Sequence, residues 1–126
     1  MSKYADVYLL PIAADKVAEY KKIAMAAGKI FIKHGALKYR EYVMSDPKAE
    51  GIIAFPSSLK LKEGETVIYA AVEFKSEAHR NATMKKIFAD PALMPPKDKP
   101  MPFDYKRMVY GGFKILVDLI VDSKPT

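Results

Sequence analysis

The spacing of the apolar residues changes along this chain, and the order of the changes is the strongest limit on its fold. Residues 4–12 alternate with the two-residue period of a strand. Residues 14–34 instead place apolar side chains on one arc of a helix, and residues 36–44 return to a strand pattern. A strand, a long helix and a second strand together predict a βαβ unit.

The second half of the chain has the same order of elements. Residues 66–74 are dense in Val, Ile and Tyr, as strands are, and Ser76 stands where it can cap a helix over 77–89. Residues 108–120 predict a long last strand, with the Gly-Gly pair at 111–112 as a bulge or a close-approach site. The whole order predicts an α+β, ferredoxin-like βαββαβ fold, an antiparallel sheet with two helices on one face.

The connections and the length indicate one domain. A chain of 126 residues fits a single domain, 1–126, with its core at about 4–120. Residues 45–64 are irregular, and the apolar run 52–55 predicts a short extra strand within them. Residues 91–107 contain five of the nine prolines, which have little backbone freedom to lose, so we expect an ordered strap there.

Composition excludes several classes of protein. The chain has no cysteine, so it has neither a disulfide framework nor a thiolate metal site. No apolar run approaches the ~20 residues of a membrane-spanning helix, and the N-terminus is a poor secretory signal, so we expect a cytoplasmic protein with no membrane partner. The net charge of +6 is scattered along the chain, which favours a solvated surface over a nucleic-acid platform.

The sequence contains none of the common motifs for nucleotide, serine-hydrolase or zinc-protease chemistry. Its two histidines do not have a metal-ligand spacing, so we expect no metal and no cofactor. His34 ends the first predicted helix on its apolar arc. It would act as a proton shuttle at a cavity mouth, or it would simply bond at the helix end, and the second interpretation needs no substrate.

The two faces of the predicted sheet can be sorted by their apolar content. We expect the helices to cover these residues of the last two strands: Ile68, Ala70, Val72, Phe74, Val109, Phe113, Ile115 and Val117. The opposite, open face would then carry Leu10, Val67, Ala71, Asp6, Tyr8, Arg40, Tyr42, Tyr69, Glu73 and Tyr110. Two helices cannot cover both faces, and an open face this rich in aromatic residues predicts a symmetric homodimer of facing sheets.

The polar residues of this open face are also the candidate ligand-binding residues. Arg40 is expected to pair with Asp6 or Glu73, because buried charges must be paired. An apolar lining with a few polar groups is typical of a small-molecule site, but interfaces are also rich in Tyr and Arg, and the sequence leaves both open. The candidates are Asp6, Tyr8, His34, Arg40, Tyr42, Tyr69, Glu73 and Tyr110.

Four segments of the chain are similar to a known family. They are HGALKYREYV at 34–43, KLKEGETV at 60–67, FKSEAHR at 74–80 and MPFDYKRMVYGGF at 101–113. These segments resemble signatures of the YbaA-like family of bacterial proteins, a domain of unknown function, and the resemblance runs from residue 4 to residue 118. It implies a dimeric α/β barrel, a superfamily that includes cofactor-independent monooxygenases and small-molecule-binding proteins. It implies no established activity, substrate or catalytic residue.

Two functions therefore remain open at the level of sequence. The first is a protein that binds an apolar or aromatic small molecule in a barrel cavity and that would be a cofactor-independent oxygenase or isomerase by analogy of fold alone. The alternative is a non-catalytic structural or regulatory homodimer. The sequence does not decide whether the protein is an enzyme.

Overall fold

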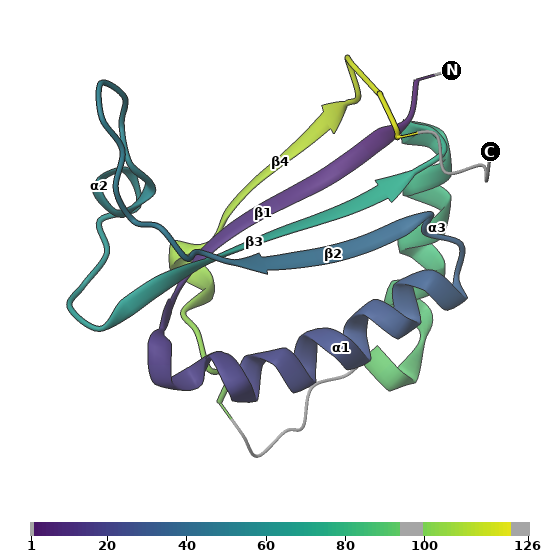
Figure 1. Cartoon of the computed structure of the whole chain (residues 1–126). Coiled ribbons are helices and arrows are strands. Elements are labelled where there is room, and N and C mark those ends of the chain that lie inside the picture. The colour runs from purple at the N-terminus through teal and green to yellow at the C-terminus, as the bar shows by residue number, and fades with distance from the viewer. Residues whose placement is uncertain (1, 94–99, 122–126) are drawn as a thin grey trace.

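A computed structural model, which describes residues 2–93 and 100–121, confirms the ferredoxin-like order of elements (Figure 1). The strands form one antiparallel sheet, and the two long helices pack on one of its faces. The main elements are β1 (Tyr4–Ala13), α1 (Val17–Lys33), β2 (Lys38–Val43), β3 (Glu65–Phe74), α3 (Glu77–Ala89) and β4 (Val109–Lys114). Short helical turns cover Ala14–Lys16, Phe55–Ser58 (α2), Pro91–Leu93 and Tyr105–Arg107. No helix in the described part of the chain is long and apolar enough to cross a membrane.

The strands lie in the order β2-β3-β1-β4, so β1 is central and has a partner on each side. Val7 of β1 lies opposite Gly111 and Asp6 lies opposite Gly112, in a register without interruption. The predicted bulge at 111–112 is therefore wrong. The predicted close approach is found, because a Cβ added to Gly112 would lie 2.1 Å from the Tyr4 hydroxyl oxygen.

Three segments differ from the sequence-based predictions. The last strand ends at Lys114, and the residues from 115 to 121 continue without strand pairing. Residues 52–55 form no strand, and the helical turn α2 begins at Phe55 instead. Residues 94–99 of the predicted strap 91–107 lie outside the described residues.

Both long helices have ends that the local sequence explains. α1 is closed by Gly35, whose φ of +115° a residue with a side chain would rarely adopt. The Gly35 N–H bonds to the Ile32 carbonyl at 3.1 Å, and the Ala36 N–H bonds to the Phe31 carbonyl at 3.0 Å, which is the Schellman pattern. At the start of α3 the side chain of Ser76 accepts a bond from a backbone N–H, as predicted.

The core consists of two clusters on the helix-covered face. One contains Val72 and Phe74 of β3 with Met84 and Ile87 of α3. The other contains Leu10 and Ile12 of β1, Ile68 of β3 and Tyr20 of α1. The predicted set Ile68, Ala70, Val72 and Phe74 indeed faces the helices. The space between the two clusters is where the candidate site lies.

The predicted faces of β1 and β4 are wrong. Leu10 is only 1% exposed within the core, and Asp6 and Tyr8 share its side of β1. On β4, Tyr110 lies opposite Tyr8 and so also faces the helices, while Phe113 is 55% exposed on the other side. The alternation alone does not show which side is covered, because both sides of these strands carry apolar residues.

Acid is expected to weaken the fold partly through Glu65, at the start of β3. Two guanidinium bonds from Arg107, at 2.6 and 2.9 Å, hold the pKa of Glu65 at about 2, below its ordinary value of 4.5. The pKa of Glu65 is lower in the folded protein than in the unfolded chain. The ion pair therefore stabilises the fold fully above the ordinary pKa of 4.5, and this stabilisation is lost as the pH falls from 4.5 towards about 2. Urea unfolding at about pH 6 and about pH 3 measures the effect. Between these pH values the free energy of unfolding should fall less for Glu65→Gln than for the wild type. An identical loss in both proteins would contradict the assignment.

Candidate site between helix α1 and the sheet

A cavity of about 240 Å³ lies between α1 and the helix-covered face of the sheet. Its floor is Ala70 of β3, a small residue that lies opposite both Glu41 on β2 and Tyr8 on β1. Because Ala70 is small, the larger side chains on either side of it enclose space. The lining is Tyr8, Leu10, Tyr20, Ile23, Ala24, Ala27, Phe31, Tyr39, Glu41, Ala70, Val72, Met101, Phe103, Tyr105 and Met108.

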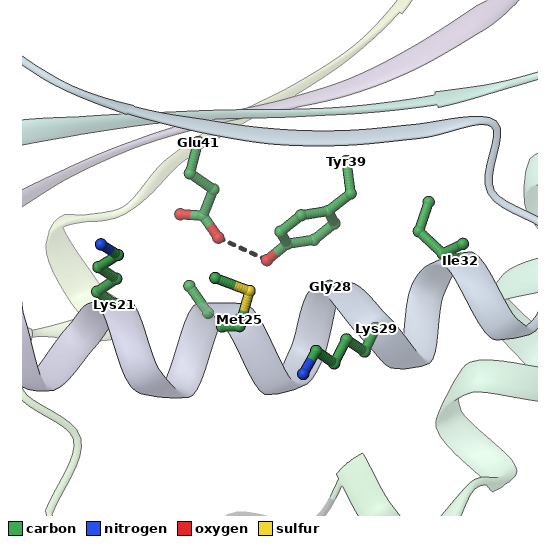
Figure 2. Close-up of a pocket in the computed structure, with 8 residues that line it drawn as sticks. Lys21, Met25, Gly28, Lys29, Ile32, Tyr39 and Glu41 are labelled. Atoms are coloured by element: carbon green, nitrogen blue, oxygen red, sulfur yellow. Dashed lines mark hydrogen bonds between the residues drawn. The ribbon is translucent and has the colours of Figure 1, made fainter.

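A wider groove of about 510 Å³ runs between α1 and β2, beside this cavity. Ala24, Tyr39 and Glu41 line both spaces, so they form the partition between the groove and the inner cavity. Figure 2 shows Tyr39 and Glu41 pointing from the strand toward α1. A Cβ on Gly28 of α1 would lie 2.7 Å from the Tyr39 ring, so only glycine lets that ring lie against the helix.

The carboxylate of Glu41 is held by two tyrosines. The Tyr39 hydroxyl donates to Oε2 at 2.5 Å, and the Tyr20 hydroxyl donates to Oε1. Burial and the adjacent carboxylate raise the pKa of both hydroxyls, so both remain neutral donors at neutral pH. Glu41 is thus an oriented acceptor at the partition.

A second polar cluster adjoins the cavity at Tyr8. Asp6, 0% exposed, accepts a bond from Arg80 Nε at 2.9 Å and another from the Tyr110 hydroxyl at 2.9 Å. Burial and the bond to Asp6 raise the pKa of Tyr110 to about 12. The rings of Tyr8 and Tyr110 pack with centroids 5.0 Å apart, and burial raises the pKa of Tyr8 as well. The cluster fixes the position of the Tyr8 ring at the cavity wall.

The sheet divides the seven strand residues among the eight predicted candidates. Tyr8 lines the cavity, and Asp6 and Tyr110 form the cluster beside it. Arg40, Tyr42, Tyr69 and Glu73 lie on the open face, where the Tyr42 and Tyr69 rings are 5.5 Å apart. The predicted pair of Arg40 with Asp6 is wrong, because the two residues lie on opposite faces and Asp6 is paired with Arg80.

His34 lies at the end of α1 and does not line the cavity. Its Nε2 is 2.8 Å from Oδ2 of Asp90, which follows α3. The bond from His34, with help from the backbone N–H of Ala92, lowers the pKa of Asp90 to about 2. The histidine therefore joins the ends of the two helices. No three His, Cys, Asp or Glu side chains among the described residues come together as a metal site requires.

Sequence reasoning missed Glu41 and the two tyrosines that hold its carboxylate, Tyr20 and Tyr39. The sequence does indicate that Tyr39 and Glu41 share a face of the sheet, since Tyr39, Glu41 and Val43 form one alternating set of the β2 sequence KYREYV. A glutamate in such a set is typical of a solvent-facing position. Its burial depends on Tyr20, which α1 brings across from 21 positions away.

Residues 3–105 match the family described as "Protein of unknown function (DUF1428)". The chain belongs to the DUF1428 family. The "Uncharacterized protein YbaA" of Escherichia coli strain K12 is 35% identical to this DUF1428 chain over 116 residues, which cover 92% of the chain and 98% of YbaA. The protein of the same name from Shigella flexneri matches with the same identity and coverage. The resemblance expected from the sequence motifs is confirmed.

Solved structures were compared with the fold of this DUF1428 chain, and one agrees with it. A dimeric ferredoxin-like protein from an uncultured marine organism matches with a TM-score of 0.55 at 10% identity, over 94% of this chain and 100% of that protein. An uncharacterized NIPSNAP domain protein from Burkholderia xenovorans matches with a TM-score of 0.47 at 16% identity, over 98% and 99% of the two chains. The first of these confirms the ferredoxin-like architecture.

Proposed function

We propose that this protein binds a small, apolar or aromatic molecule in the cavity between α1 and the sheet. The observation that carries the proposal is the lining: aromatic and aliphatic side chains surround the space, and Glu41 with its two donors, Tyr20 and Tyr39, supplies a small group of polar atoms. Few polar groups in an apolar hollow are typical of small-molecule sites. If the ligand is also converted, Glu41 is the group placed to accept a proton from it, as a cofactor-independent isomerase or oxygenase would require.

Filling the floor of the cavity tests this proposal. Ala70→Leu should weaken the binding of a neutral aromatic probe, indole, at least tenfold, because the longer side chain occupies the space between Glu41 and Tyr8. An NMR titration of the labelled protein measures the affinity. Ala82→Leu, at an exposed position of α3, is the matched control and should bind indole as the wild type does. Unchanged binding in Ala70→Leu would refute the proposal.

The open face of the sheet supports a second proposal, that two copies pair through it as a homodimer. Large apolar side chains are exposed there, including Tyr42 at 48%, Val109 at 49% and Phe113 at 55%. The segment after β4 adds Leu116, exposed at 95%, and its apolar neighbours. Exposed apolar surface of this extent usually marks an interface. The matching marine protein is described as dimeric, and a second copy is the occupant that such a face would take here.

This homodimer is also the basis of the alternative function, a structural or regulatory protein without a ligand. The two functions differ in one measurement. A ligand that binds the native state raises the melting temperature, so a reproducible rise with a member of a metabolite library would favour the binding function. A library with no such member would favour the alternative.

A further inference from the structure

The inner cavity carries a single formal charge. Among the described residues that line it, Glu41 is the only charged one. The two groups that bond its oxygens are the neutral hydroxyls of Tyr20 and Tyr39. Hydrogen bonds from neutral donors satisfy the carboxylate oxygens but leave the negative charge in place.

No cation of the described part of the chain forms an ion pair with this carboxylate. No Lys, Arg or His nitrogen there lies within 4.0 Å of the Glu41 carboxylate. Lys21 and Lys29 line the outer groove, but both residues are exposed on α1, where water screens them. Arg80, on the far side of Tyr8, is already bonded to Asp6. A half-buried carboxylate without an ion-pair partner favours a cationic ligand.

The walls of the cavity fit the same kind of ligand. Six aromatic rings line it: Tyr8, Tyr20, Phe31, Tyr39, Phe103 and Tyr105. Neighbouring rings meet at steep angles, with Tyr20 and Phe103 at 79° and centroids 5.6 Å apart, and Phe103 and Tyr105 at 62° and 4.8 Å. These inclined rings form much of the lining of the space. The face of an aromatic ring attracts a cation, and quaternary ammonium groups are bound in such aromatic cages.

We propose that the ligand of this cavity is an organic cation, an alkylated ammonium group held between the aromatic rings and Glu41. The assignment rests on the proposed function and names its ligand class. An anionic ligand would meet the carboxylate with like charge, and a neutral ligand would leave the charge of Glu41 unbalanced. The volume of about 240 Å³ accommodates a trimethylammonium group with a short substituent.

Two probes of the same shape test the charge directly. Choline and 3,3-dimethyl-1-butanol differ by a quaternary nitrogen in place of a carbon, so a difference in affinity reports the cation alone. NMR titration of the wild type should show choline binding at least tenfold more tightly than the alcohol. Glu41→Gln should bring this ratio close to one. Glu73→Gln, a matched change on the open face, should leave the ratio as in the wild type.

A variant that keeps the carboxylate separates the effect of the rings from that of the charge. Phe103→Leu removes one wall of the cage and should also weaken choline binding, by about fivefold to tenfold, in line with the ~1 kcal/mol typical of a cation–ring contact. Equal binding of choline and the alcohol to the wild type would overturn the cation assignment. If indole binds and choline does not, the cation assignment fails and the proposed function stands. If none of the three probes binds, both fail.

Discussion

Arg80→Ala is expected to lower the free energy of unfolding by about 3–5 kcal/mol, the typical cost of removing one partner of a buried ion pair. The partner is Asp6, whose side chain is completely buried, whereas the Arg80 side chain is 25% exposed. In the variant Asp6 keeps only the bond from Tyr110, and a buried carboxylate with one neutral donor is poorly compensated. Equilibrium urea unfolding measures the change.

Two further variants show whether the loss comes from the stranded carboxylate. Lys86→Ala changes an exposed cation on the same helix and should alter the unfolding free energy by no more than about 0.5 kcal/mol. Asp6→Asn in the Arg80→Ala background removes the unpaired charge and should recover part of the loss. An effect of Arg80→Ala no larger than that of Lys86→Ala would show that the pair contributes little to stability.

Val7→Lys is expected to raise the dissociation constant of the proposed homodimer at least a hundredfold. Val7 lies on the central strand, opposite Ala71 and Gly111, on the face that no helix covers. In a separate chain the new ammonium group would be in water, but between two facing sheets it would be desolvated without a partner. Sedimentation velocity at micromolar concentration measures the assembly, and circular dichroism confirms that the variant is folded.

Val43→Lys is the matched control for this prediction. Val43 is exposed at the end of β2, and its register opposite Ile68 puts it on the other face of the sheet. The substitution should leave the dimer intact. A wild-type protein that sediments as a monomer, or a dimer weakened equally by both variants, would rule out pairing through the open face.

The element order could be predicted from the sequence, whereas the faces of two strands could not. Strand and helix differ in apolar period, so α3 was predicted with its observed bounds, 77–89. On β1 both alternating sets are apolar, one with Val7 and Leu9 and the other with Leu10 and Ile12. Because Asp6 is charged, it indicates that the alternating set to which it belongs, the one with Leu10 and Ile12, faces solvent. Its burial depends on Arg80, 74 positions further along the chain, and no local pattern shows such a partner.

The same limit explains the candidate site. The sequence predicts Tyr8 as a site residue on the open face, whereas Tyr8 lines the cavity on the helix-covered face. The sequence does not single out Glu41, because a strand glutamate is ordinarily solvated and its donors come from α1 and from within β2. A cavity also depends on small side chains. Nothing in the sequence around Ala70 shows whether this alanine lies beneath an empty space or is packed against other side chains.

The position of β1 in the sheet has a consequence for protein synthesis. Of the described strands, β1 leaves the ribosome first. One of its edges pairs with β3, but the other pairs with β4, which is complete only when Lys114 has been added. Until that point a nascent chain carries a ten-residue strand with unpaired backbone groups, the kind of edge that joins other chains in aggregates. Nascent chains stalled before residue 109 should therefore depend on chaperones more than the released protein does.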